Sequence, residues 1–260
     1  MLAALISSLL FAQAAGPPPL EQVRLESCLG QAREDPATAI SEASSWLQGV
    51  GAPESSYPQQ CLGYAYTLLL RWDAAERAFL TAREQELAAN SLRRAQLATM
   101  AGNAALADSR GEAALAALTL AASDAQASGD GALRSVVETD RARALVLLER
   151  QPDAEAALAS ARTFDSQNAL AWLLSATLAR RLGRLDEAQG FIATAHALKP
   201  DDGETGLEAG VIAMLQGRED AAAASWRSVL EVDPDSLTAD IARGYLAQVE
   251  QPAAERPAEQ

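Results

Sequence analysis

The chain has 260 residues, of which 49% are hydrophobic but only 5% aromatic, and its formal net charge is −14. This balance excludes the broad basic surface that a nucleic-acid-binding protein needs, and an anionic membrane surface would repel the chain for the same reason. The sequence is rich in alanine, the strongest helix former, and lacks the β-branched, period-2 runs of strands, so we expect an all-α fold.

Residues 1–14 predict a secretory signal peptide. Residues 2–11 are apolar apart from two serines, and Ala12-Gln13-Ala14 forms a small-x-small cleavage site. An apolar segment of about ten residues is too short to span a bilayer but has the length of a signal. No Lys or Arg precedes it, which departs from the usual pattern, so a flexible N-terminal tail on a cytoplasmic protein is the alternative. We expect a periplasmic or secreted mature chain without a membrane span.

The next segments predict a proline-rich linker over residues 15–20 and a helix hairpin within residues 21–55. One helix is expected from about Glu21 to Arg33, a break at Asp35-Pro36, and a second helix up to about Gln48. The segment has no clear repeat motif. Because one side of a terminal repeat faces water, departure from a consensus is typical of the first unit of an array.

Residues 56–236 repeat themselves with a fixed period near their end. Pro200 and Pro234 lie 34 residues apart, as do Gly183 and Gly217, and Ala188 and Ala222. A period of this length indicates a helical solenoid in which each hairpin buries its apolar side against its neighbours.

The repeated residues resemble those of tetratricopeptide repeat (TPR) proteins, whose units carry Trp-x2-Leu-Gly-x2-Tyr on the first helix, Ala-x3-Phe on the second, and a closing Pro. The matching residues are Leu62, Gly63, Tyr66, Ala75, Phe79 and Ala82 in the first unit; Trp172, Ser175, Ala176, Ala179, Ala188, Ile192, Ala195 and Pro200 in the fourth; and Ala209, Gly210, Ala213, Ala222, Trp226, Val229 and Pro234 in the fifth. The resemblance implies an all-α, right-handed superhelical solenoid of about five antiparallel helix hairpins, in an exported bacterial protein.

Two weaker units lie between the first and the fourth. In the second, we expect Gly111 to open a second helix that carries Ala116 and Leu120; in the third, Ala154, Leu158 and Ala161 follow Ala142 and Leu145. The steps from Ala75 to Ala116 and from Ala116 to Ala154 are 41 and 38 residues, which are longer than the period. We therefore expect insertions, with residues 127–132 as a candidate place.

The repeated residue types have physical reasons. Small residues such as Ala176 and Gly210 are expected where two helices cross closely, with larger ones such as Ile192 and Trp226 beside them. The turn between the two helices favours glycine, as at Gly111, Gly183 and Gly217, because a helix C-terminus often needs a positive φ.

The C-terminal segments predict a cap and a tail. Residues 237–251 place Leu237, Ile241, Tyr245 and Leu246 on one stripe of a helix, which is typical of the polar-backed capping helix that a solenoid needs. Residues 252–260 have the composition of a disordered tail.

Cys28 and Cys61 lie 33 residues apart, close to one repeat length, so both could face the seam between neighbouring units. In an exported protein we expect a structural disulfide that fastens the N-terminal hairpin to the array. The alternatives are two buried free thiols, or a redox-active pair, although no basic residue flanks Cys61. Two thiols without histidines do not form a zinc site.

The resemblance also implies a function. TPR proteins bind peptides or protein segments in a groove built from the first helices of their units, and they act as adaptors rather than catalysts. Carried onto this sequence, the groove positions are Tyr57, Gln60, Tyr64, Thr139, Arg143, Leu173, Thr177, Arg180 and Arg181. Arginines there could pair with the carboxylates of a partner segment, or could be solvated residues at the helix end.

We therefore expect a non-catalytic adaptor of the cell envelope with a protein or peptide partner. The sequence contains no metal-protease, phosphate-loop or serine-nucleophile motif, and no cofactor, metal or nucleic-acid partner is expected. Two alternatives belong to other classes: a self-associating structural scaffold, and a thiol-redox accessory protein that uses Cys28 and Cys61.

Overall fold

A computed structural model describes residues 20–250, and within that range the chain forms thirteen α-helices and no strand. The expected signal peptide, the linker up to residue 19 and the C-terminal tail lie outside the described residues. The helices are α1 (Leu20–Glu34), α2 (Pro36–Gln48), α3 (Ser56–Leu68), α4 (Trp72–Gln85), α5 (Ser91–Ala107), α6 (Gly111–Ser128), α7 (Gly131–Leu147), α8 (Gln151–Phe164), α9 (Ala169–Arg181), α10 (Leu185–Leu198), α11 (Gly203–Leu215), α12 (Glu219–Val232) and α13 (Leu237–Glu250).

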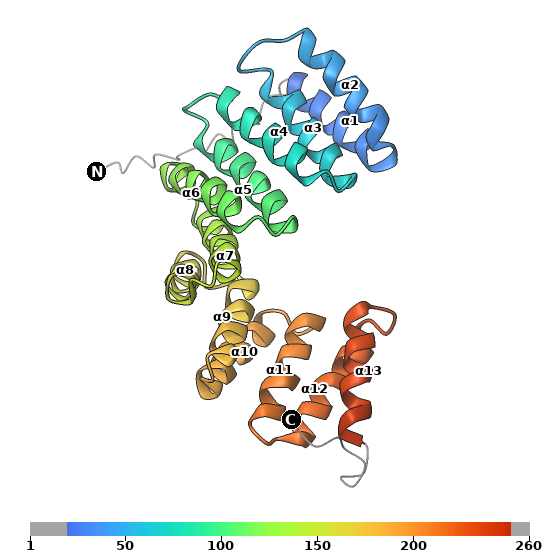
Figure 1. Ribbon diagram of the computed structural model, residues 1–260, viewed down its shortest axis with the longest axis vertical. Helices are drawn as coiled ribbons and strands as arrows, with labels where there is room; N and C mark the ends of the chain where they lie inside the picture. The colour runs from blue at the N-terminus through green and yellow to red at the C-terminus, as the bar shows by residue number, and fades with distance from the viewer. Residues whose placement is uncertain (1–19, 251–260) are drawn as a thin grey trace, which may run out of the picture.

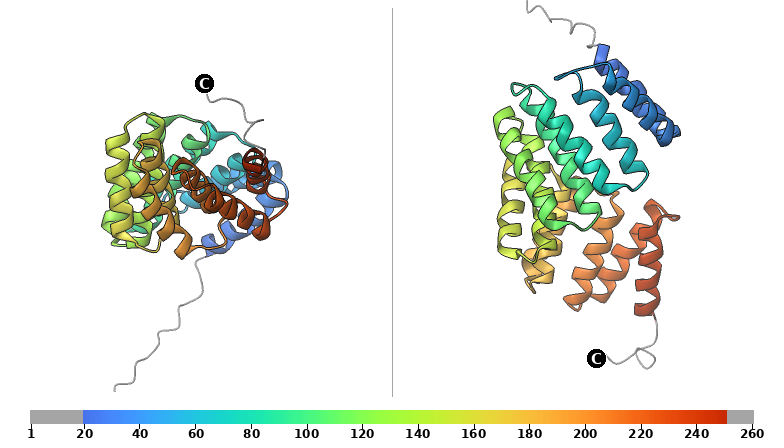
Figure 2. Two further views of the ribbon diagram at one scale, coloured as in Figure 1. Left: turned by 90° about the horizontal axis from the view of Figure 1, so that it is seen from below. Right: turned by 45° about the horizontal axis from the view of Figure 1, so that its top comes forward.

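The helices stack one pair after another along a curved path. The two ends, α1–α4 and α11–α13, lie on the same side of α6–α8, which form the outside of the curve in all three views (Figures 1 and 2). The apolar core is a series of separate clusters, each shared by successive helices, rather than one centre. This arrangement confirms the expected all-α solenoid; six helix pairs and α13 are described, one pair more than the expected five because the N-terminal hairpin adds a unit.

In each of the five units that follow the N-terminal hairpin, a small residue of the first helix packs against a large residue sixteen positions later on the second helix. A Cβ atom added to Gly63 would lie 2.6 Å from the Phe79 ring, and one added to Gly102 or Gly210 would overlap Leu118 or Trp226. The fourth unit uses Ala176 and Ile192, both buried in one cluster. The expected close crossings of the two helices are confirmed, and the small residues allow them.

The register predicted for the second unit is wrong by two residues. Ala116 and Leu120 are exposed, whereas Ala114 and Leu118 are buried and occupy the positions of Ala154 and Leu158. The residues in excess of the period are not in the turn at residues 127–132, where only Gly129 and Asp130 separate α6 from α7. They lengthen the helices instead: α5, α6 and α7 have 17, 18 and 17 residues, whereas α8–α12 have 13 or 14.

The turn between the two helices of a unit needs a residue in the left-handed conformation. Gly183 and Gly217 supply it in the last two units, each with φ of 75°. Gly111 does not: it is the first residue of α6, and Ser109 has the positive φ in that turn. Leu70 and Glu149 hold the same conformation in the first and third units.

The left-handed conformation at Glu149 predicts a stabilising substitution. Glu149 has φ of 59° and an exposed side chain, and the left-handed region costs an L-residue roughly 1–2 kcal/mol. Glycine does not have this cost, but its greater freedom in the unfolded chain offsets about half of the gain. We expect Glu149→Gly to raise the free energy of unfolding by about 0.5–1 kcal/mol, measured by urea denaturation. Ala159→Gly, at an exposed position inside α8, is the control and should lower it by about 1 kcal/mol. Equal losses in both variants would contradict the strain at Glu149.

An arginine follows each of these five turns, and the arginines of the second, fourth and fifth units, Arg110, Arg184 and Arg218, connect neighbouring units. The backbone N–H of Arg110, like that of the other four, donates to the carbonyl five residues earlier and closes the turn. The side chain of Arg110 pairs with Glu76 on α4, and that of Arg184 pairs with Glu155 on α8, in each case the second helix of the preceding unit. These contacts reinforce the seam between units.

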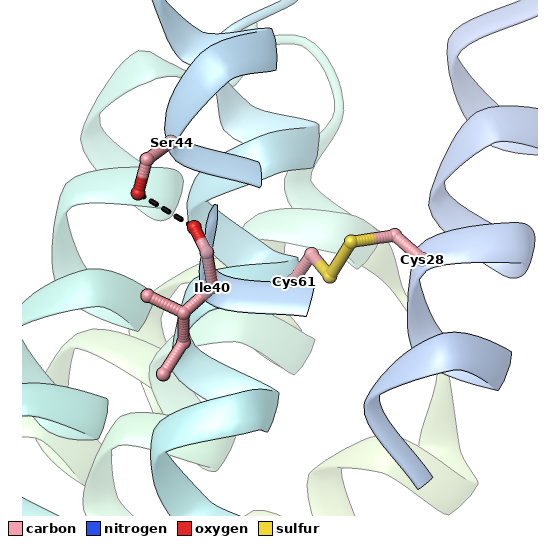
Figure 3. Close-up of a disulfide and its surroundings, with 4 residues drawn as sticks. All are labelled: Cys28, Ile40, Ser44 and Cys61. Atoms are coloured by element: carbon pink, nitrogen blue, oxygen red, sulfur yellow. Dashed lines mark hydrogen bonds between the residues drawn. A yellow bond between two sulfur atoms is a disulfide. The ribbon is translucent and has the colours of Figure 1, made fainter. Parts of the chain in front are cut away.

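The N-terminal hairpin is fastened to the array by a disulfide. Cys28 of α1 and Cys61 of α3 are bonded to each other, as Figure 3 shows beside Ile40 and Ser44 of α2. The break between α1 and α2 falls at Asp35, whose carboxylate accepts hydrogen bonds from the backbone of Ala37 and the backbone and hydroxyl of Thr38. These hydrogen bonds hold the pKa of Asp35 below its ordinary value, and the two from Thr38 have the largest effect.

Candidate functional site

The residues predicted for the groove in the first unit make contacts within the chain. The guanidinium of Arg93 lies 4.2 Å from the centre of the Tyr57 ring, and the Tyr64 hydroxyl accepts a hydrogen bond of 3.2 Å from Arg33 Nε. Gln60 is half-buried beside them on α3. The two tyrosines are partly exposed, but their rings lie against arginines of α1 and α5.

Two of the predicted groove residues lie inside the protein. Thr139 is 2% exposed; its hydroxyl donates to the Ser135 carbonyl and accepts from Asn168, which precedes α9. Leu173 is 6% exposed and belongs to the cluster shared by α9, α10 and α11.

Arg180 connects two units. Its Nε and Nη2 atoms donate to the two carboxylate oxygens of Glu208 on α11, at 2.6 and 3.3 Å, and both side chains are largely buried. Because of this bidentate pair, Nε and Nη2 of Arg180 are already occupied by a carboxylate within the protein.

The remaining three predicted residues meet at one cleft. Arg143 of α7 and Thr177 and Arg181 of α9 line a hollow of about 210 Å³ between these two helices. Its other lining residues are all apolar: Ala142, Val146, Leu158, Leu174 and Leu178. We call this hollow the α7–α9 cleft. Sequence reasoning predicted its polar rim but missed its apolar floor.

The two arginines of the α7–α9 cleft differ in their partners. Arg143 Nη1 donates to Asp140 at 3.1 Å, and the Arg143 side chain is still 48% exposed. Arg181 is exposed, and no ion pair or hydrogen bond joins its guanidinium to another of the described residues. The rim of the cleft therefore carries one guanidinium without a carboxylate partner and one with a single contact.

Asp140 is the buried carboxylate behind this rim, and the sequence did not mark it. Its side chain is 7% exposed and accepts a hydrogen bond of 2.9 Å from Asn103 Nδ2 in addition to the one from Arg143. Burial raises the pKa of Asp140 above its ordinary value, although Asn103 and the charge of Arg143 act in the opposite direction.

A second hollow of about 180 Å³ lies on the other side of Leu158 and Leu178, between α8, α9 and α10. Arg162 enters it, lies 4.5 Å from the centre of the Phe191 ring, and donates to the Ser175 hydroxyl. Its carboxylates, Glu155 and Glu187, both pair with Arg184. The seam between the third and fourth units therefore has a hollow on each side.

Within residues 20–250 no group of His, Cys, Asp and Glu side chains is arranged to hold a metal ion. No helix of that range is long and apolar enough to cross a membrane. His196 lies exposed in the last turn of α10.

No protein-family model matches the sequence, and a comparison with curated proteins gives no match. Solved structures match well. PilW, described as a widely conserved type IV pilus biogenesis factor, has a TM-score of 0.68 at 16% identity over 86% of this chain and 98% of its own. PilF of Pseudomonas aeruginosa has 0.65 at 16% identity over 86% and 96%. YrrB, described as a TPR protein with an unusual peptide-binding site, has 0.51 at 18% identity over 78% and 97%. The chain has the fold of these TPR proteins.

Proposed function

We propose that this chain, a solenoid with the fold of TPR proteins, is a non-catalytic adaptor that binds a segment of a partner protein. The observation that carries the proposal is the α7–α9 cleft, an apolar hollow rimmed by Arg143, Thr177 and Arg181. It lies between the first helices of two consecutive hairpins, which are the helices that build the binding groove in the family resembled. A concave, mostly apolar site with a few polar groups is what ligand recognition requires.

The fold supports this function more than it supports catalysis. YrrB, which shares the fold, is described by its peptide-binding site. The two hollows at the seam of the third and fourth units are lined mainly by apolar side chains and arginines, and the two carboxylates of one of them, Glu155 and Glu187, are both paired with Arg184. We therefore propose binding without chemistry.

For the location we propose the periplasm. The disulfide between Cys28 and Cys61 is typical of an oxidising compartment. Residues 1–14 have the pattern of an export signal. PilW, with the same fold, is described as a pilus biogenesis factor, which is a role at the cell envelope.

Burial of the two cysteines favours the adaptor over the redox alternative. Cys61 is fully buried and Cys28 is 7% exposed, so a thiolate of another protein could not reach the disulfide without local unfolding. The scaffold alternative predicts self-association, and light scattering of the concentrated protein should instead give the mass of a monomer.

Affinity capture tests the proposed function. The mature chain from Ala15 serves as bait for envelope extract beside an Arg143→Ala/Arg181→Ala variant, which we expect to recover at least tenfold less partner because it lacks both rim charges. Arg180 is left intact, since its loss would leave Glu208 buried without its pair.

The matched control for this capture is Arg243→Ala. Arg243 pairs with Asp240 three residues earlier and is 48% exposed, as Arg143 is with Asp140, but it lies on α13 at the end of the array. We expect the control to recover partner as the unaltered chain does. Equal recovery by all three baits would contradict the assignment of binding to the cleft, and an absence of any specific partner would contradict the adaptor function itself.

A further inference from the structure

Resting on the proposed function, we propose that the α7–α9 cleft takes an internal acidic segment of the partner, with one Phe or Leu side chain inserted in the hollow and carboxylates of neighbouring residues on Arg143 and Arg181. The argument depends on the volume of the hollow, the chemistry of its floor and the charges on its two sides.

The volume suits one large apolar side chain. An apolar protein cavity of about 150 Å³ holds a benzene ring, and the cleft offers about 210 Å³. Its floor is formed by Val146, Leu158, Leu174 and Leu178, which have no polar side-chain atoms. A polar side chain would lose its hydrogen bonds with water there without replacement, so the floor favours an apolar one.

The rim suits negative charge on both sides of that side chain. Arg143 comes from α7 and Arg181 from α9, so each of these two helices contributes one arginine to the lining of the cleft. Arg143 uses one nitrogen atom on Asp140, which leaves donors of its planar fork for a second carboxylate, and Arg181 has its whole fork available. Asp140, the carboxylate nearest to Arg143 in sequence, is already paired with it, and Glu208 of α11 is paired with Arg180.

An internal segment fits better than a chain terminus. A terminal carboxylate offers a single charge, whereas the rim offers two guanidinium groups, one from each helix. Acidic residues on either side of one apolar residue would satisfy both. Although the whole chain is acidic, exposed charges farther away than about 8–10 Å are screened at physiological salt, so the rim charges dominate at contact.

A synthetic peptide tests this inference. The probe is fluorescein-labelled Gly-Ser-Asp-Glu-Phe-Asp-Glu-Ser-Gly with a C-terminal amide, titrated with the mature chain and followed by fluorescence anisotropy. We expect saturable binding in the micromolar range. Replacing Phe by Ala, or the four acidic residues by their amides, should each weaken binding at least tenfold, because one removes the group in the hollow and the other the ion pairs.

Variants of the protein locate the binding. Arg181→Gln should lower the affinity for the peptide about tenfold. Thr177→Phe fills the hollow with a ring of the chain itself, so it should abolish binding while the melting temperature stays within a few degrees of that of the unaltered chain. Arg243→Gln is the control and should bind as the unaltered chain does. Equal affinity for the charged and the amide peptides, or equal losses in Arg181→Gln and Arg243→Gln, would overturn the inference.

The outcome separates the two proposals. A chain that captures a partner from extract but does not bind this peptide at millimolar concentration refutes the acidic-anchor chemistry and leaves the adaptor function standing. A form of the peptide that ends in a free carboxylate directly after Phe and binds tenfold tighter than the probe would assign the cleft to a chain terminus and also overturn the inference. Binding of the peptide without any specific partner in extract would contradict the adaptor function alone.

Discussion

Replacing Cys28 and Cys61 by serine is expected to lower the stability of the N-terminal part of the array by about 3–4 kcal/mol, one of the two largest effects predicted here. The disulfide joins residues 33 apart, and cross-linking a loop of this size removes much of the conformational freedom of the unfolded segment. Among the described residues no helix precedes the hairpin of α1 and α2, and the clusters that bury it are shared only with α3 and with Ala78 of α4. Urea unfolding followed by Trp46 fluorescence measures the loss, because Trp46 lies in the cluster that contains both cysteines.

The loss should be local. The stability of a repeat array is approximately the sum of the stabilities of its units and of the interfaces between neighbouring units, so a weakened N-terminal hairpin need not unfold the last unit. We expect amide hydrogen exchange to accelerate in α1–α3 and to remain unchanged in α9–α13. Treating the unaltered chain with a reductant is the control and should reproduce the result. Uniform acceleration along the chain, or no change in α1–α3, would contradict the role of the disulfide as a fastening of the first hairpin.

The sequence predicts the fold well where the repeats keep both their period and their contrast between small and large residues. The units around Gly210 and Trp226, and around Ala176 and Ile192, obey the 34-residue period, and the structure confirms both pairs. Because each unit buries its residues only against its neighbours, a local pattern contains nearly all of the information needed for the fold.

The register of the second unit could not be predicted as well, because several neighbouring alanines fit the repeat pattern equally. Residues 113–117 offer four alanines, and any of them satisfies a pattern that asks for a small residue. What fixes the register is the contact between Gly102 and Leu118, one of the few places in the unit where a small and a large residue must coincide. The extra turns of α5–α7 shift the spacing from the period, so counting by 34 also fails there.

The candidate site was predicted in part for a related reason. A repeat position that faces the groove in an average unit is exposed only if the next unit leaves it uncovered. Thr139 is covered because Asn168, at the start of α9, bonds to it, and this depends on the tilt between two units rather than on either unit's sequence. Arg143, Thr177 and Arg181 stay at the surface because they lie on later turns of α7 and α9, where the two helices leave the cleft between them.

Gly210→Ala is expected to lower stability by about 2–4 kcal/mol, although it adds a single methyl group. The added Cβ would occupy the space of the Trp226 ring, and α11 and α12 would have to separate. Trp226 donates from Nε1 to the Leu207 carbonyl and packs against Tyr245 of α13, with ring centres 5.0 Å apart. A displaced ring would therefore loosen the capping helix as well.

The fourth unit shows how this clash can be repaired, because it holds the combination of Ala176 and Ile192 at the same two positions. Trp226→Ile alone should also destabilise the chain, since it leaves a cavity beside Gly210. In the double variant Gly210→Ala/Trp226→Ile, the new methyl group occupies part of that cavity, so the double variant should be more stable than the sum of the two single losses predicts, by at least about 1 kcal/mol. Urea denaturation of the unaltered chain, the two single variants and the double variant gives the four free energies of unfolding that this comparison needs. Additive losses would mean that the residue pair does not set the distance between the two helices. The explanation of the repeat by the packing of a small residue against a large one would then be wrong.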